Sequence, residues 1–140
     1  MTSLLAVFIC KINGMKTIIT GGNSGIGYET AVSLAKQNHT IILTARQLAS
    51  AQAARERILQ AVSTAEIIPL QLDLNSFKSI EHFANAVHEK TTVLDNLICN
   101  AGVMNPPYSR TDDGFESQFQ ANYLGHFYLF QLLLDLLRLS

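Results

Sequence analysis

A glycine-rich string, Thr20-Gly21-Gly22-Asn23-Ser24-Gly25-Ile26-Gly27, offers the clearest chemistry in the sequence. It follows a β-branched run and precedes a stretch whose apolar residues have helical spacing. The N-terminus of a helix carries unpaired N–H groups and about half a positive charge, so it suits a dinucleotide's pyrophosphate. In that role Gly21 permits a tight turn, Gly25 lets backbone approach the phosphates, and Gly27 lets helix and strand pack closely. The string predicts a dinucleotide site; the alternative is an ordinary strand-to-helix turn.

Arg46 is the residue that bears on which dinucleotide would bind. An NAD-specific site places an acid at the end of the second strand, roughly 20 residues past the glycines. Here that place reads Thr44-Ala45-Arg46, with no acid. A planar guanidinium pairs well with a 2′-phosphate, which favours NADP(H) over NAD(H). The alternative is a solvated surface arginine that opens the next helix.

Strand-like and helix-like patterns alternate along the chain and would position these residues. Apolar runs predict strands at 17–20, 40–44, 67–72 and 94–99, and helical spacing predicts helices at 26–37, 48–62, 76–90 and 113–139. The tandem prolines Pro106-Pro107 place residues 103–112 in a loop. Continuous apolar strands separated by helices are typical of a parallel sheet covered on both faces. The predicted fold is an incomplete α/β doubly wound parallel sheet (Rossmann), with four β-α units and strand order 3-2-1-4.

The last predicted helix is apolar on nearly every side beyond Tyr123, and such a helix must be buried on every face. Gly125, His126, Gln131 and Asp135 interrupt it, which makes a membrane span the weaker interpretation. We expect one face to pack on the sheet and the other on a partner helix. The sequence therefore predicts a homo-oligomer formed through this helix.

Composition limits the classes of function. The chain has 140 residues, with Lys+Arg 10 against Asp+Glu 11 and a net charge of −1. This balance argues against a nucleic-acid binder and a polybasic membrane-surface module, and the length suits one domain. Cys10 and Cys99 both lie in apolar runs, which predicts reduced core cysteines in a cytoplasmic protein, with membrane association of a longer form left open. The histidines show no metal-ligand spacing, so no metal site is predicted.

Residues 1–14 form a separate segment of unknown role. Their apolar run, 4–10, is too short to span a bilayer and lacks the flanks of a secretory signal. Either Met15 is the natural start and this segment is an upstream extension, or it is a short N-terminal strand or disordered lead. We assign residues 15–140 to the N-terminal part of an NAD(P)-binding domain.

The sequence resembles the short-chain dehydrogenase/reductase family through four motifs that occur in order. They are the glycine string at 20–27, Asp73-Leu74 after the third predicted strand, Asn100-Ala101-Gly102 after the fourth, and Asn122-Tyr123-Leu124-Gly125-His126-Phe127 in the last helix. Cys99 stands where the family's Asn-Asn-Ala-Gly motif has its first Asn, which puts part of that motif's bracing role in doubt. The stretch 100–127 is most similar to the retinol-dehydrogenase-like branch.

The resemblance implies a role for each matched position. Gly21, Asn23, Ser24, Gly25, Ile26 and Gly27 would hold the pyrophosphate, and Asn100, Ala101 and Gly102 would line the nicotinamide ribose side. Asp73 and Leu74 match the position that binds the adenine amino group, although Asp73 is equally interpreted as a turn residue before a helix. Asn122 matches the Asn of the family's Asn-Ser-Tyr-Lys tetrad, where it supports a proton relay; alternatively it caps a buried carbonyl.

The implied function is hydride transfer between NADP(H) and a small, lipophilic alcohol or carbonyl compound. The family's Ser and Tyr-x-x-x-Lys belong on a fifth strand and its following helix, and Tyr108, Tyr123 and Tyr128 lack a Lys four residues on. We therefore expect this chain to supply the cofactor-binding half and to be inactive alone. The alternative is a non-catalytic, truncated dinucleotide-binding or dimerising protein. The glycine spacing disfavours an epimerase-like relative, and Thr20 stands where a methyltransferase would normally have an acid.

Overall fold

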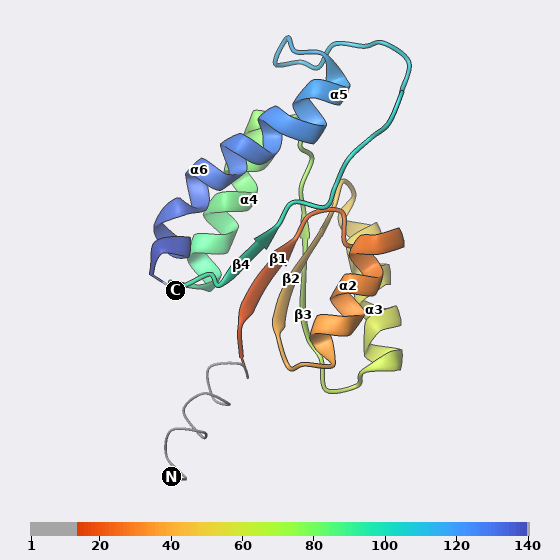
Figure 1. Ribbon diagram of the computed structural model, residues 1–140, viewed down its shortest axis with the longest axis vertical. Helices are drawn as coiled ribbons and strands as arrows, with labels where there is room; N and C mark the ends of the chain where they lie inside the picture. The colour runs from red at the N-terminus through yellow and green to blue at the C-terminus, as the bar shows by residue number, and fades with distance from the viewer. Residues whose placement is uncertain (1–13, 140) are drawn as a thin grey trace.

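The computed structural model describes residues 14–139, and its centre is a parallel sheet with strand order β3-β2-β1-β4 (Figure 1). The predicted fold class and strand order are confirmed. The strands are β1 (Lys16–Ile19), β2 (Thr40–Ala45), β3 (Glu66–Gln71) and β4 (Asn96–Ile98). The helices are α2 (Gly25–Ala35), α3 (Leu48–Ala61), α4 (Phe77–Lys90), α5 (Ser117–Phe119) and α6 (Gly125–Arg138), with a π-helical turn, η1 (Gln120–Leu124), between α5 and α6. The segment 1–13, with its predicted extension, lies outside the described residues.

Helices cover both faces of the sheet, because the strands are apolar on both sides. α2 and α3 lie on one face and α4 and α6 on the other (Figure 1). On the first face Ile19, Ile41 and Leu43 pack with the buried alanines of α2 and α3. On the second face Ile18 and Ile42 pack with Leu129, Leu133 and the apolar side of α4. These two cores fix the carboxyl ends of all four strands relative to the helices that follow them.

The last helix begins later than its pattern predicts. Residues 113–116 are not helical: Gly114 has a φ of +88°, and Arg110 and Glu116 form an isolated antiparallel bridge. Glu116 then caps α5, its carboxylate accepting bonds from the backbone N–H of Gln118 at 2.8 Å and Phe119 at 2.7 Å. These bonds lower the pKa of the Glu116 carboxyl. An acidic N-cap marks the start of a helix, but hydrophobic periodicity alone does not detect it.

One expectation of burial is wrong and another stays a prediction. The single chain exposes an aromatic stripe on the last predicted helix, made of Phe119, Tyr123, Phe127 and Phe130, and its expected cover by a partner helix stays a prediction. Cys99 is exposed rather than part of the core, because it follows β4, which is an edge strand of the described sheet.

Asp113 joins the loop after β4 to the start of α4. Its Oδ2 accepts the backbone N–H of Phe77 at 2.9 Å and the side-chain amide of the buried Gln120 at 2.6 Å. We expect Asp113→Ala to lower the free energy of unfolding by about 2 kcal/mol, because a helix cap is lost and a buried amide loses a partner. Chemical denaturation measures this. The neighbouring exposed Asp112→Ala is the control, and equal effects of the two variants would contradict the assignment.

His88 joins α4 to α6 through Asp135, and the pair makes stability depend on pH. His88 Nδ1 lies 2.8 Å from the Ala84 carbonyl and Nε2 3.1 Å from Asp135 Oδ2. The bond to the Ala84 carbonyl raises the pKa of His88 above 6.5, and the bond to His88 lowers the pKa of Asp135 below 3.8. The contribution from His88 is present below pH 6.5 and lost as pH rises through its raised pKa; that from Asp135 is present above pH 3.8 and lost as pH falls.

We therefore expect the melting temperature of wild type to exceed that of Asp135→Asn by the widest margin between pH 3.8 and 6.5. The margin should shrink above neutral pH, as His88 loses its proton. Thermal melts across the pH range measure it, with Asp112→Asn as control. A margin that stays constant through pH 8 would show that the ion pair does not contribute.

Among residues 14–139, no helix combines the length and apolar character that crossing a membrane requires.

Candidate functional site

A cleft of about 830 Å³ opens at the carboxyl ends of the strands, where the glycine string and the loops after β2, β3 and β4 meet. In a doubly wound sheet, ligands bind at this edge, beside the point where the strand order reverses. Here that point lies between the paired strands β1 and β4, because β2 and β3 follow on one side of β1 and β4 lies on the other. Nine of the twelve predicted cofactor residues are in its wall: Gly21, Asn23, Ser24, Arg46, Asp73, Leu74, Asn100, Ala101 and Gly102. Gly25, Ile26 and Gly27 are not among its lining residues.

The glycine turn leaves the N-terminus of α2 open to this cleft. Gly21 and Gly25 have φ values of +64° and +54°, in the left-handed region that favours glycine. Ser24 is the N-cap of α2 and makes no side-chain capping bond within the described chain. A Cβ added at Gly25 would meet nothing within 4 Å. The first turn of α2 therefore has free N–H groups and open space beside them, which an anionic group would fit.

Gly27 and Asn100 hold helix α2 against the sheet. A Cβ at Gly27 would collide with the Asn100 side-chain amide and lie 2.6 Å from the Gly21 carbonyl oxygen. Asn100 Nδ2 donates to the carbonyls of Thr20 at 2.9 Å and Gly21 at 3.2 Å. The close packing expected of Gly27 is present, and Asn100 braces the glycine turn directly. Ile26, at 81% exposed, reaches no wall of the cleft.

Thr20 organises the turn that follows β4. Its hydroxyl oxygen accepts the backbone N–H of Asn100 and of Ala101, both at 2.9 Å. The same oxygen lies 2.8 Å from His126 Nε2. Thr20 is fully buried, so these bonds replace its contacts with water.

Asn122, the predicted catalytic residue, lies in the π-helical turn η1. Its side chain makes two bonds to one residue, accepting from the Val103 N–H at 2.8 Å and donating to the Val103 carbonyl at 2.7 Å. π-turns of this kind recur at functional sites. The side chain thus fastens the loop after β4 to the helix, while its backbone carbonyl faces His126 Nδ1 at 3.3 Å.

Arg46 and Asp73, which follow β2 and β3, both line the cleft. Arg46 is exposed at the end of β2, and its carbonyl accepts a bond from the Gln71 side chain at 3.0 Å. Asp73 Oδ1 accepts the N–H of Asn75 at 2.9 Å, which is the turn role left open by the sequence, and its second carboxylate oxygen has no bond in the described chain. The Oδ1 atom of Asn75 is buried without a partner among the described residues. A ligand donor in the cleft would satisfy it.

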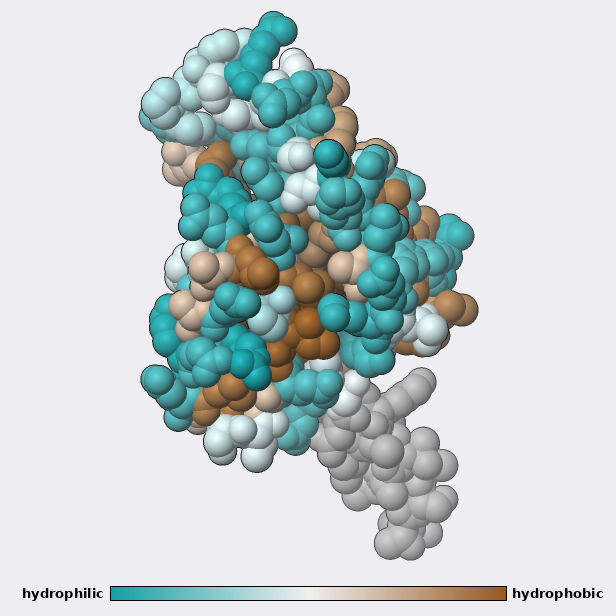
Figure 2. Space-filling model, turned by 180° about the vertical axis from the view of Figure 1, so that it is seen from behind, coloured by the Kyte–Doolittle hydropathy of each residue, from teal (hydrophilic) through white to brown (hydrophobic). Residues whose placement is uncertain are grey.

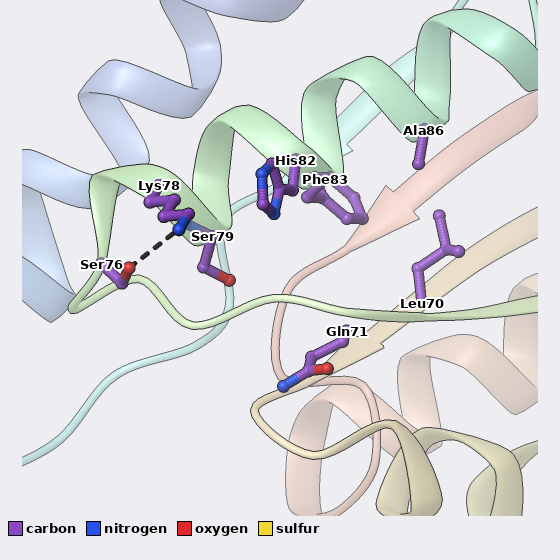
Figure 3. A pocket seen from close by; sticks show the side chains of 8 residues that line it. All are labelled: Leu70, Gln71, Ser76, Lys78, Ser79, His82, Phe83 and Ala86. Carbon is purple, nitrogen blue, oxygen red and sulfur yellow. Dashed lines mark hydrogen bonds between the residues drawn. The ribbon is translucent and has the colours of Figure 1, made fainter.

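A second hollow lies between β3 and α4, lined by Leu70, Gln71, Ser76, Lys78, Ser79, His82, Phe83 and Ala86 (Figure 3). Figure 2 shows apolar atoms across the middle of the back of the molecule, bordered by polar atoms. Within the hollow Ser76 Oγ accepts the N–H of Ser79 at 3.2 Å, which is the cap of α4. Its serines bond at the helix start, Gln71 donates to the Arg46 carbonyl, and no residue of the glycine string lines it. Among residues 14–139, no cluster of three or more His, Cys, Asp or Glu could hold a metal ion.

Comparisons with known proteins agree with this architecture. The family model described as short chain dehydrogenase matches residues 16–139. The WW domain-containing oxidoreductase of Homo sapiens is 46% identical over 124 residues, which cover 89% of this chain and 30% of that protein. Retinol dehydrogenase 13 of Homo sapiens is 45% identical over 129 residues, covering 92% and 39% of the two chains. A solved Pseudomonas aeruginosa RhlG/NADP active-site complex has a TM-score of 0.78 and 29% identity, covering 92% of this chain and 50% of the other.

The fold is thus a doubly wound α/β architecture with a cleft at the carboxyl ends of its strands. The chain belongs to the short-chain dehydrogenase family, and it spans 30% and 39% of the two human relatives.

Three residues of the site were not predicted from the sequence: Asn75, Gly125 and His126. Gly125 and His126 stood in the helix motif, but periodicity presents them only as interruptions of an apolar helix. Gly125 lies against the Leu74 carbonyl, which a Cβ would approach to 2.5 Å, and His126 Nε2 lies 2.8 Å from the Thr20 hydroxyl oxygen. No local spacing signals such contacts between distant parts of the chain.

Proposed function

We propose that this chain supplies the dinucleotide-binding half of an NADP(H)-dependent oxidoreductase that acts on an alcohol or carbonyl compound, in keeping with its retinol dehydrogenase relative. The observation that supports this most is the juxtaposition of the open α2 N-terminus, Arg46, and the Asn100–Gly102 turn around one cleft. The nicotinamide would supply the hydride chemistry when bound. Residues 15–140 would form the N-terminal part of a longer domain, and residues 1–14 an extension.

Each part of the cleft would then have one task. The N–H groups at the start of α2, with Asn23 and Ser24, would bind the pyrophosphate, and Arg46 the 2′-phosphate. The adenine would lie against Asp73, Leu74 and the buried Asn75 Oδ1. Its amino group could donate the hydrogen bond that this oxygen does not receive within the described chain. Ala101 and Gly102 would border the nicotinamide ribose. Asn122 would hold a proton-relay water at its backbone carbonyl oxygen.

The cofactor preference is tested at Arg46. We expect Arg46→Ala to weaken NADP⁺ binding roughly 10- to 100-fold, the worth of hydrogen bonds to a charged group, and to leave NAD⁺ binding unchanged. Calorimetric titration of both nucleotides measures this. Arg138→Ala, which removes an exposed arginine at the far end of α6, is the control. Equal losses for NADP⁺ and NAD⁺ would contradict a 2′-phosphate contact.

A second candidate function, a non-catalytic dinucleotide-binding or dimerising protein, is favoured by one observation. The aromatic stripe on η1 and α6 is exposed, with Tyr123 at 60% and Phe127 at 51%, and their rings stack at 6.4 Å between centroids. Such a patch favours association with another surface. Homo-oligomerisation through α6 is therefore part of the proposal, and a cytoplasmic location stays a prediction.

A further inference from the structure

His126 is a buried titratable residue between two loops of the cleft, and the function described so far gives it no task. It is 7% exposed and lies in the first turn of α6. Its Nε2 is 2.8 Å from the hydroxyl oxygen of Thr20, and its Nδ1 is 3.3 Å from the carbonyl oxygen of Asn122. The ring therefore connects the end of β1 to the π-turn.

The bonds of Thr20 decide which nitrogen of the ring carries the proton. A hydroxyl oxygen has two lone pairs, and those of Thr20 accept the N–H groups of Asn100 and Ala101. The hydroxyl proton must then be donated, and His126 Nε2 at 2.8 Å is a better acceptor than the Ile98 carbonyl at 3.4 Å. Nε2 is consequently unprotonated. The neutral ring carries its proton on Nδ1 and donates it to the Asn122 carbonyl.

The neighbouring bonds show what this arrangement fixes. Thr20 holds the loop after β4 at Asn100 and Ala101, and Asn122 holds the same loop at Val103 through both of its side-chain bonds. His126 bonds to both of these residues. Burial lowers the pKa of His126 and outweighs the bond to Asn122, which raises it, so the ring stays neutral at physiological pH.

We propose that His126 is a positioning residue: as the neutral Nδ1–H tautomer it joins Thr20 to Asn122 and so fixes the 100–103 loop against the glycine turn. The consequence for cofactor binding rests on the proposed function, in which this loop borders the nicotinamide ribose. His126 also sets the direction of the Asn122 carbonyl, the atom to which the relay water is assigned.

Nitrogen-15 NMR of the histidine rings tests the join without any cofactor. We expect His126 to have a protonated Nδ1 and an unprotonated Nε2 at pH 7, and Thr20→Val to shift the Nε2 resonance most. The exposed His82 is the internal reference. A protonated Nε2, an imidazolium at pH 7, or no response to Thr20→Val would overturn the proposal. A purely space-filling role would not select one tautomer.

Titration with NADP⁺ tests the effect on the site. We expect His126→Phe to weaken binding about tenfold, because two hydrogen bonds are lost, while His82→Phe leaves it unchanged. His126→Gln should recover part of the loss, since its amide can still accept from Thr20, and it covers the case in which the Phe variant does not fold. Wild-type affinity in a folded His126→Phe would overturn the positioning role. If wild type itself fails to bind NADP⁺, the proposed function fails, and the NMR result alone decides whether His126 joins Thr20 to Asn122.

Discussion

Gly27→Ala is expected to abolish measurable dinucleotide binding and to lower the free energy of unfolding by about 2 to 3 kcal/mol, the upper part of the range for overpacking. The added Cβ would lie 2.6 Å from the Gly21 carbonyl oxygen and would collide with the Asn100 amide. Asn100 cannot swing aside without breaking its bonds to Thr20 and Gly21. Helix α2 must therefore move outward, and its open N-terminus moves with it.

Two variants separate packing from the site itself. Ser33→Ala changes the exposed face of the same helix and should leave both stability and binding unchanged. Gly25→Ala places its Cβ in open space at a positive φ, so it should cost only about 1 kcal/mol of backbone strain. It should still remove nucleotide binding, because that space is assigned to the pyrophosphate. Tight NADP⁺ binding by Gly25→Ala would contradict the assignment. Urea denaturation and calorimetry measure the two quantities.

Gly125→Ala is expected to lower the free energy of unfolding by about 2 to 3 kcal/mol as well. A Cβ there would lie 2.5 Å from the Leu74 carbonyl oxygen and 3.0 Å from the Gln120 carbonyl oxygen, and both are backbone atoms with little freedom to shift. The backbone N–H of Gly125 closes the π-turn on Gln120. The variant should therefore displace α6 from the loop after β3, and weaken nucleotide binding through Asp73 and Leu74.

The matched control is Gln131→Ala, on the exposed side of the same helix. It removes a side chain without changing any contact with the loop after β3, and we expect a change of less than about 0.5 kcal/mol, as for ordinary surface positions. Thermal and chemical denaturation of the two variants make the comparison. Equal stability of Gly125→Ala and Gln131→Ala would show that α6 does not need the close approach.

The sequence predicted the elements whose signals are local. Strand order, the parallel sheet and the strand-to-helix placement of the glycine turn all follow from apolar runs and spacing, and Gly21 and Gly27 have the geometry expected of them. Nine of the predicted cofactor residues lie in the wall of one cleft, because parallel strands bring their carboxyl ends to one edge.

What could not be predicted depends on contacts far apart in the chain. The sequence predicts that the last helix is apolar on nearly every side, but a hydrophobic pattern does not identify the neighbour that covers each side. Cys99 was assigned to the core because the edge position of β4 is a property of the sheet, not of its own run. His126 was read as an interruption, since its partners Thr20 and Asn122 come from a different strand and from the preceding turn.

The central claim is that the cleft at the carboxyl ends of the strands binds a nicotinamide dinucleotide. Titration of NADP⁺ into the ¹⁵N-labelled chain, followed by amide chemical shifts, tests it most directly. We predict saturable binding, with the largest shifts at Gly21, Ser24, Gly25, Ala101 and Gly102 and weaker binding of NAD⁺ at the same residues. No saturable binding, or shifts confined to the hollow between β3 and α4, would contradict the claim.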